Sequence, residues 1–320
     1  MKWRAGIWGC VALATMACGG APGVRTGPDG RVAVVWETEV YADHPLVGRI
    51  WSTARGAFVE PAALLEGLRA APVVLLGERH DHADHHRLQG WILSRLDGAT
   101  VVGFEMLDEA DVAPIAGVTG SDALRDAVQW SQSGWPAFPL YRPVFDAVFA
   151  AGQQMVAVHP AKTRLRALMT GPASQSTENR ALATTLSPPG LATLREDITQ
   201  SHCGHASPVI VDAMVLAQRF KDRWMMARLL EAAGTRPAVL VAGNGHVRKD
   251  YGAPNDLAVP AASVGLIEVE GDKLTAADYH PERFDWVWFT PRVDDVDPCE
   301  KFRTQLERIR AHSKAKREGG

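Results

Sequence analysis

The sequence predicts an α/β fold, in which a mainly parallel sheet is flanked by helices and accompanied by a smaller helical subdomain. Short apolar runs typical of buried strands alternate with segments of helical periodicity, and this alternation favours a parallel sheet. Residues 161–235, in contrast, contain no convincing strand. The chain has 320 residues, of which 46% are hydrophobic and 22% charged, so its composition is that of an ordinary globular protein.

The segment from residue 73 to residue 96 organises this fold. Its first residues, Val73–Leu76, form a continuous apolar run, which predicts a strand buried on both faces, and Gly77 ends that run. A turn rich in His and Asp follows, after which Leu88 and Ile92 recur at helical spacing. The pattern therefore predicts a strand, a polar turn and a helix. In a parallel sheet such a turn lies at the carboxyl ends of the strands, where ligands bind.

The rest of the chain can be divided around this segment. Further buried strands are expected at 100–104, 154–158, 238–242 and 263–269, and the longest helix at about 208–233. We therefore expect a signal segment at residues 1–18, a tether at 19–30, a sheet domain formed by 31–160 and 236–290, a helical subdomain at 161–235, and a solvated tail at 300–320.

The N-terminus has the features of an export signal. Lys2 and Arg4 give it a basic start, and residues 5–17 are almost all apolar or small. Cys18 after a small residue resembles the lipobox of bacterial lipoproteins, although Thr15 stands where Leu or Val is usual. We therefore expect export to the cell envelope and a lipid anchor on Cys18, in either the inner or the outer membrane. A plain secretory signal is the alternative.

Charge and cysteine content exclude several classes of protein. The formal net charge of −3 gives no electrostatic basis for binding nucleic acid. Cys10 and Cys18 belong to the export signal, so only Cys203 and Cys299 remain in the body. Two cysteines could form one disulfide in an exported protein, but they are too few for a four-thiolate zinc or iron–sulfur site.

Carboxylate and imidazole side chains follow the predicted strands where each one ends. Because parallel strands end at the same edge of a sheet, these side chains should converge there. Such a cluster could hold a divalent metal, perform acid–base catalysis, or form a polar floor beneath a ligand. The residues concerned are Glu78, His80, Glu105, His159, Asn244 and His246, and the metal or catalytic set would be Glu78, His80, Glu105 and His246.

Two further groups of histidines are candidates for binding. His82 and His86 share a helix face, which is either a metal-capable spacing or simply a solvated first turn, whereas His85 lies on the stripe turned towards the core. The string from His202 to His205 includes Cys203 and could ligate a metal or haem, or present a reactive thiol.

The motif Leu76-Gly77-Glu78-x-His80-Asp81, followed by His85-His86 and Gln89, resembles the signature of the ChaN family of haem-binding, iron-regulated lipoproteins. The resemblance covers roughly residues 45 to 280. Other matching pieces occur in the same order: Phe104-Glu105-Met106, Tyr141-Arg142-Pro143, His202-Cys203-Gly204, Ala217-Gln218-Arg219 with Lys221-Asp222 and Met226-Ala227, and Ala242-Gly243-Asn244-Gly245-His246-Val247-Arg248.

This resemblance implies a homodimer that holds haem between protomers, with a tyrosinate on the iron and a partner histidine near the haem. A phenolate oxygen suits ferric iron in a carrier. Tyr141 is the first candidate because it lies in the Tyr-Arg-Pro motif, and Tyr251 and Tyr279 remain alternatives. The histidines that would contact the cofactor are His202, His85 and His86.

Two functional hypotheses follow from the sequence. The first is a haem-binding lipoprotein for iron acquisition or storage, which is a binding protein rather than an enzyme. The second is a metal-assisted or acid–base hydrolase that cleaves an ester or peptide at Glu78, His80, Glu105 and His246. The second hypothesis draws on the wider superfamily, because erythromycin esterases and the Tiki and TraB proteins share the Gly-Glu-x-His strand end. A structural envelope protein with a vestigial site is the remaining alternative.

Overall fold

The computed structural model describes residues 24–26, 32–170, 185–301 and 303. The predicted export signal and Cys18 lie outside the described residues, as does most of the expected tail. Within this part of the chain, no helix is both long enough and apolar enough to cross a membrane.

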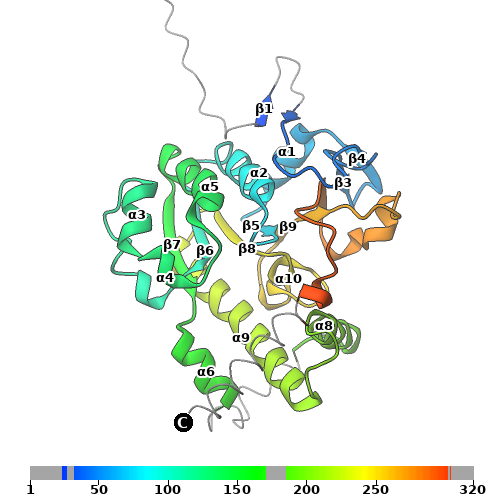
Figure 1. Ribbon diagram of the computed structural model, residues 1–320. Helices are drawn as coiled ribbons and strands as arrows, with labels where there is room; N and C mark the ends of the chain where they lie inside the picture. Colours follow the sequence, from blue (N-terminus) through cyan, green and yellow to red (C-terminus); the bar gives the residue numbers. More distant parts are fainter. Residues whose placement is uncertain (1–23, 27–31, 171–184, 302, 304–320) are drawn as a thin grey trace, which may run out of the picture.

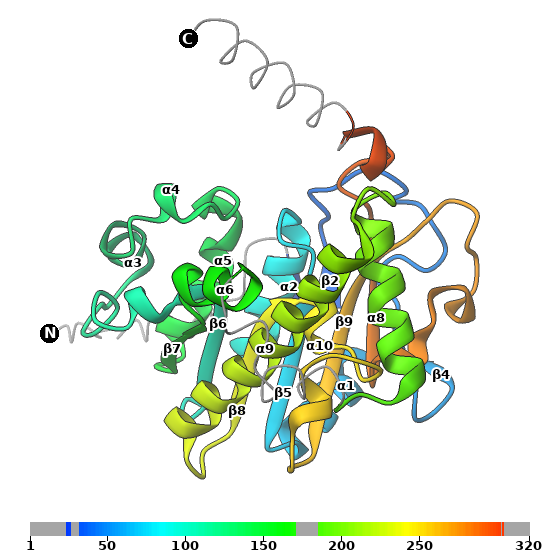
Figure 2. The same cartoon turned by 90° about the horizontal axis from the view of Figure 1, so that it is seen from below.

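The described residues form one large sheet with helices on both faces (Figures 1 and 2). Its eight strands lie in the order β4-β3-β10-β9-β5-β8-β6-β7. All neighbours from β10 to β7 run parallel, whereas β3 pairs antiparallel with both β10 and β4. The expected fold class, a mainly parallel sheet flanked by helices, is confirmed. The strands are β3 (Ile50–Ser52), β4 (Ala57–Val59), β5 (Val73–Glu78), β6 (Val101–Asp108), β7 (Gln154–His159), β8 (Ala238–Gly243), β9 (Ala261–Glu268) and β10 (Trp286–Thr290).

Both faces of the central strands are buried, and successive residues enter different cores. In β5, Val74 and Leu76 pack into the core that contains α1 (Pro61–Ala70), α2 (Ala83–Leu93) and α5 (Phe138–Ala150). Val73 and Leu75 enter the opposite core, which contains the second half of α9 (Pro208–Ala233). Apolar side chains on both faces explain why the strand sequences are continuously apolar rather than alternating.

Shorter elements complete the chain. The strands β1 (Val24–Thr26) and β2 (Val32–Val34) form a separate antiparallel pair. Further helices are α3 (Ser121–Ala127), α4 (Trp130–Ser133), α6 (Lys162–Thr170), α8 (Pro188–Ser201) and α10 (Asn244–Val247), and 3-10 turns lie at Glu109–Asp111, Ala253–Asp256, Ala276–Tyr279 and Pro281–Arg283.

The described part of residues 161–235 is helical, as the sequence predicts. The helix α9 packs against β6, β7 and β8 as well as against α6 and α8 (Figure 2). A disulfide between Cys203 and Cys299 joins the end of α8 to the C-terminal segment. The division of this region from the sheet as a subdomain stays a prediction.

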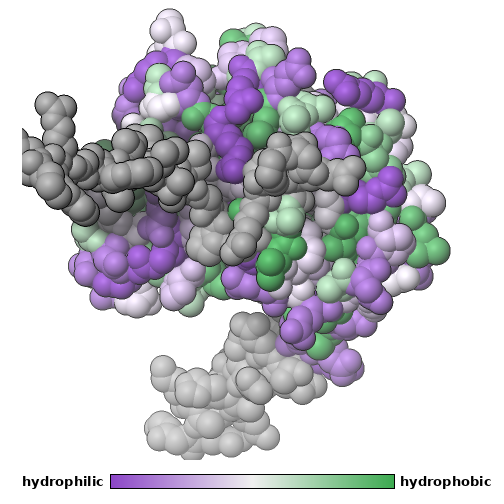
Figure 3. Space-filling model, turned by 90° about the horizontal axis from the view of Figure 1, so that it is seen from above, coloured by the Kyte–Doolittle hydropathy of each residue, from purple (hydrophilic) through white to green (hydrophobic). Residues whose placement is uncertain are grey.

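The face shown in Figure 3 carries hydrophilic and hydrophobic residues side by side. Most large apolar side chains lie inside instead, where they form the two cores that cover the sheet. The sheet therefore holds the carboxyl ends of β5, β6, β7 and β8 in fixed positions at one edge.

Candidate functional site

Glu78 ends β5 on the face covered by α2 and α5. Alternate residues of a strand point to the same face, so Glu78 points to the same face as Val74 and Leu76. Its side chain is fully buried on that face, beneath α2 and α5. Glu78 Oε1 lies 2.7 Å from His80 Nδ1 and accepts a hydrogen bond of 3.2 Å from the Tyr141 hydroxyl. Glu78 Oε2 lies 3.3 Å from His86 Nε2. The carboxylate is therefore held between three side chains.

His80 connects this carboxylate to a second one on the other face of the sheet. Its Nδ1 faces Glu78, and its Nε2 lies 3.7 Å from Glu105 Oε2. The imidazole passes the end of β8 at Gly243, where a Cβ atom would lie only 2.9 Å from His80 Nε2. Glycine at this position thus leaves room for the bridging imidazole.

Glu105 and His246 form the second carboxylate–imidazole pair, on the face covered by α9. The Gly243 amide donates to Glu105 Oε2 at 2.8 Å, and His246 Nε2 lies 3.1 Å from Glu105 Oε1. The other ring nitrogen of His246 contacts the Asp222 carboxylate at 2.5 Å. Lys221 Nζ lies 3.1 Å from His246 Nε2 and 4.0 Å from Glu105 Oε1. One imidazole therefore stands between two buried carboxylates.

The electrostatics of the cluster favour charged pairs. Burial opposes ionisation of Glu78, but the neighbouring His86 and His80 outweigh it and lower the pKa of this carboxyl to about 2. Burial also opposes the charge on His80, yet Glu78 and Glu105 raise its pKa to about 8. In the second pair, the attraction between Glu105 and His246 again outweighs the effect of burial. The pKa of Glu105 therefore lies well below its usual range, and the pKa of His246 is raised. At neutral pH both carboxylates are ionised and the His80 imidazole carries a proton.

A pocket of about 620 Å³ opens beside this cluster, between the ends of β6 and β7 and the segment from Gln129 to Trp135, which contains α4. The Trp135 ring contacts His80 at a centroid distance of 4.8 Å and His159 at 6.4 Å. Burial lowers the pKa of His159 to about 4, so its imidazole is neutral. Residues that line the pocket include Glu105, Met106, Asp111, Trp135, His159 and Lys162.

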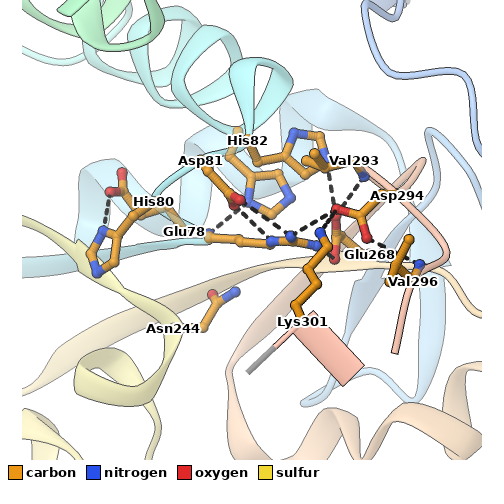
Figure 4. A network of polar contacts seen from close by, with 12 residues as sticks. Glu78, His80, Asp81, His82, Asn244, Glu268, Val293, Asp294, Val296 and Lys301 are labelled. Atoms are coloured by element: carbon orange, nitrogen blue, oxygen red, sulfur yellow. Dashed lines mark hydrogen bonds and ion pairs between the residues drawn. The ribbon is translucent and has the colours of Figure 1, made fainter. Parts of the chain in front are cut away.

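Polar contacts also fasten the turn after β5 to the C-terminal segment. Arg79 contacts Asp81 and Glu268 at 2.7 Å each and Asp294 at 3.5 Å, and Lys301 contacts Asp294 at 2.7 Å. Figure 4 shows this network on one side of the β5 end and the Glu78–His80 pair on the other. The network thus holds the turn that carries His80.

The other histidines of this turn lie inside the protein. His82, His85 and His86 are each 0% exposed, so the interpretation of His82 and His86 as a solvated first turn is wrong. The His85 ring accepts a hydrogen bond from the Arg79 amide and contacts Thr290 Oγ1, and burial holds its pKa well below the usual value. These positions do not favour direct contact between His85 or His86 and a cofactor.

Tyr141 is also interior. Its side chain is fully buried, its ring lies 4.0 Å from the His86 ring, and its hydroxyl donates to Glu78. Burial, together with the charge of Glu78, raises the pKa of this phenol. A tyrosinate at Tyr141 would face an ionised carboxylate, so the structure does not favour this residue as an iron ligand.

His202 lies at the end of α8, apart from the strand ends. Its Nδ1 is 2.8 Å from the Ile198 carbonyl, and the adjacent Cys203 is bonded to Cys299. The alternative of a reactive thiol at Cys203 is therefore wrong, and the pairing that the sequence left open is resolved.

The proposed metal set is not arranged for coordination. In the described part of the chain, no group of three or more His, Cys, Asp or Glu residues is placed to hold a metal ion. Glu78 and Glu105 instead pair separately with His80 and His246. The structure therefore gives no support for a divalent metal at these four residues.

Sequence reasoning assigned no role to three residues of the site. Asp222, Lys221 and Trp135 come from α9 and from a loop, not from strand ends. The motif comparison does include Lys221-Asp222. Asp222, which is 0% exposed, lies at helical spacing from the buried Met225 and Met226 of α9, and an acidic residue on that apolar stripe is the signal that could have found it.

Comparison with known proteins identifies the family. Residues 64–257, more than half of the chain, match the family described as haem-binding uptake, Tiki superfamily, ChaN. The chain belongs to the ChaN family. A solved structure of ChaN from Campylobacter jejuni, described as showing cofacial heme binding, is similar with a TM-score of 0.58 and 20% identity over 75% of this chain and 95% of that one. At this identity the likeness shows the ChaN fold alone.

Two other solved structures are less similar to this ChaN-family chain. The type III effector HopBA1 matches with a TM-score of 0.40 and 14% identity over 71% of this chain and 91% of its own. RRSP, a toxin effector domain from Vibrio vulnificus, matches with a TM-score of 0.35 and 15% identity over 63% of this chain and 35% of its own. No curated protein matches.

The pocket beside the cluster has a mixed lining. It combines the Trp135 ring and apolar side chains such as Pro114 with the neutral imidazole of His159 and the cationic Lys162. Haem requires an apolar cavity, a ligand for its iron and polar partners for its propionates. Three carboxylates, those of Glu105, Asp108 and Asp111, also line the pocket. This lining does not fit a macrocycle that carries two propionates.

Proposed function

We propose that this protein is a haem-binding lipoprotein of the ChaN type, exported to the cell envelope, which serves in the acquisition or storage of haem or iron. The observation that carries the proposal is the family match, since residues 64–257 include both carboxylate–imidazole pairs and all residues that line the pocket. The C. jejuni relative, whose structure is described as showing cofacial heme binding, supports the same assignment.

In this proposal haem is held between the two protomers of a homodimer, as the family resemblance implies. The ionised Glu78–His80 pair holds the loop that carries Trp135, through the contact between the His80 and Trp135 rings. Haem itself supplies the iron that the protein carries.

Titration of the purified protein with hemin tests the proposal directly. We expect a shifted and intensified Soret band that saturates at a defined ratio. Light scattering of the same samples tests the homodimer, whose mass should appear or increase on loading. Absence of any saturable spectral change in the wild-type protein would refute the haem assignment.

A hydrolase is the second candidate, because two buried carboxylates, each paired with an imidazole, lie at the edge of the pocket between β6 and β7. Glu105 would take a proton from the water that attacks the ester or peptide carbonyl. His80 would give its proton to the leaving oxygen or nitrogen when that bond breaks. The low pKa of Glu105 makes it a weak base, which is why this function ranks second.

A panel of esters and peptides distinguishes the two candidates. Turnover that disappears in both Glu105→Gln and His80→Gln, while hemin binding persists, would establish the hydrolase. The Asp122→Asn substitution is the matched control, because Asp122 is an exposed carboxylate paired with Arg142 on the surface. Equal background rates in all four proteins would remove this candidate.

A further inference from the structure

We infer that the Cys203–Cys299 disulfide is a redox-sensitive fastening, whose reduction releases residues 294–301 from the turn that carries His80. These residues are the outer part of a C-terminal strap, which we define as residues 291–301. The inference goes beyond the proposed haem function and does not depend on it. It follows from three observations: where the two cysteines lie, which backbone conformation Cys203 adopts, and how the strap meets the turn after β5.

Both cysteines lie at the wall of a surface pocket of about 630 Å³, and each is only partly buried. The rest of the lining is mostly polar and charged, and it includes Thr199, Gln200, His205, Asp297, Glu300 and Arg303. Thiol–disulfide exchange requires a thiolate to reach a sulfur atom, so access is one of the factors that set its rate. A dithiol in solution can therefore reach this bond while the protein stays folded.

The backbone at Cys203 is strained. Helix α8 ends with a hydrogen bond of 2.8 Å from the Cys203 amide to the Gln200 carbonyl, and one of 2.9 Å from the Gly204 amide to the Thr199 carbonyl. Cys203 has a φ of 55°, in the left-handed region, at the position after a helix where glycine is usual. A residue with a side chain is strained in this conformation. Reduction removes the covalent constraint on Cys203, so this turn can relax once the bond is broken.

The inner end of the strap is anchored without the crosslink. The Pro291 carbonyl lies 2.9 Å from Nε2 of the buried His82. The Val293 amide donates a hydrogen bond of 2.8 Å to Glu268 Oε1. Residues 291–293 should therefore stay in place whether or not the disulfide is intact.

The outer part of the strap is held by exposed contacts and by the crosslink. Asp294 lies 3.5 Å from Arg79 and 2.7 Å from Lys301. Asp295 accepts an exposed hydrogen bond of 2.7 Å from the Tyr41 hydroxyl. Figure 4 shows Asp294 and Lys301 beside the turn after β5. Because ion pairs between exposed side chains contribute little to stability, residues 294–301 can leave the turn once the disulfide is broken.

The proposed reaction is reduction of the disulfide by a dithiol. One thiolate of the dithiol attacks a cysteine sulfur and breaks the S–S bond, which gives a mixed disulfide and a thiolate on the other cysteine. The second thiolate of the dithiol then displaces the bound cysteine and closes the reductant's own disulfide. Two electrons pass from the dithiol to the protein, and the two cysteine thiolates take up the two protons that the dithiol releases. Reoxidation reverses these steps and fastens the strap again.

Hydrogen–deuterium exchange of the mature protein, with and without dithiothreitol, tests the inference. Iodoacetamide labelling followed by mass spectrometry shows whether both cysteines are reduced. On reduction under native conditions, we expect exchange at residues 294–301 to rise at least ~10-fold, because exchange follows the local stability of a segment. Exchange at residues 79–82 should rise as well, whereas exchange within β5 and β8 should not change. Reoxidation should restore the slow exchange.

Two variants separate the crosslink from the ion pairs. Cys203→Ser with Cys299→Ser should exchange like the reduced wild type at residues 294–301 and should not respond to dithiothreitol. Asp294→Asn loses the ion pairs but keeps the disulfide, so it should exchange like the oxidised wild type. Fast exchange in this variant would show that the ion pairs hold the strap, and it would overturn the inference.

Two results with the wild type would also overturn the inference. One is confirmed reduction with unchanged exchange in either segment, and the other is a disulfide that is reduced only after the protein unfolds. Circular dichroism shows whether the reduced protein and the variants are folded. Because none of these measurements involves hemin, failure of the haem assignment would leave this inference standing.

Discussion

At the scale of single residues, His80 is the side chain on which the site depends. Glu78 faces the core under α2 and α5, Glu105 faces α9, and the His80 imidazole contacts both carboxylates around the end of β8. An ionised imidazole between two carboxylates compensates for part of the cost of burying them. Removing the imidazole takes a positively charged partner away from both buried carboxylates. One substitution therefore affects both faces of the sheet.

The charge on His80 predicts a specific dependence of stability on pH. Its folded-state pKa, about 8, is above the ordinary value of 6.5, so its contribution to stability is fully present below pH 6.5 and is lost as pH rises through 8. The free energy of unfolding of the wild type should therefore exceed that of His80→Gln by more at pH 6 than at pH 9. Urea denaturation of both proteins at several pH values measures this difference, and a constant gap would contradict the ionised bridge.

Gly243 gives a second prediction at this scale. In Gly243→Ala the new methyl group would lie 2.9 Å from His80 Nε2, so the imidazole must move from its place beside Glu105. We expect the pKa of His80, measured by NMR titration of the ring protons, to fall from about 8 towards its ordinary value. Gly245→Ala is the control, because its Cβ would meet other side chains only at 3.8 Å. The same shift in both variants would refute the steric explanation.

At the scale of elements, the difference between strands and helices decides what could be read from the sequence. The strands that carry Glu78 and Glu105 are marked by continuous apolar runs, and their parallel pairing follows from the intervening helices, so convergence of these ends was predictable. Their side-chain partners were not, because Asp222 and Trp135 belong to a helix and a loop whose positions follow from packing. The burial of His82 and His86 was missed for a related reason. Their polarity suggests solvent, but the turn is covered by neighbouring segments such as the one around Pro291.

The link between α8 and the C-terminal segment can be tested in a double variant. Cys203→Ser with Cys299→Ser removes the disulfide and frees a loop of 96 residues in the unfolded chain. We expect the free energy of unfolding to fall by about 2–4 kcal/mol, mainly because the unfolded state gains conformational entropy. Thermal unfolding of the variant and of the wild type, with and without reductant, checks this value. Reductant should lower the free energy of unfolding of the wild type alone. Equal stability of the wild type and the double variant without reductant would contradict the crosslink.

At the scale of the whole molecule, the family assignment and the fold agree, although the residues expected around the cofactor do not gather in one place. Tyr141, His85 and His86 are interior, and His202 lies at the end of α8. A linear motif marks family membership through residues that maintain the core of the fold as well as through residues that meet a ligand. The burial of each motif residue shows to which of these two groups it belongs, and burial is known only from the folded structure.

The proposed lipid anchor leads to a prediction for the complete precursor. Replacement of Cys18 by Ser removes the thiol that would carry the lipid, so the protein should move from the membrane fraction to the soluble envelope fraction of an expressing bacterium. Immunoblots of the fractions and the intact mass of the mature protein measure this change. Cys10→Ser is the control, because Cys10 lies within the apolar stretch of the signal. Identical distribution of all three proteins would refute the anchor.

The Cys203–Cys299 bond also has a practical consequence for anyone who prepares this protein. Bacterial cytosol keeps thiols reduced, whereas the periplasm allows them to pair. Material from a cytosolic expression strain would begin with Cys299 unlinked, near the Asp294 and Lys301 contacts that reach Arg79. Periplasmic secretion or refolding in a glutathione buffer is therefore the appropriate source for spectroscopy, and a free-thiol assay should accompany each batch.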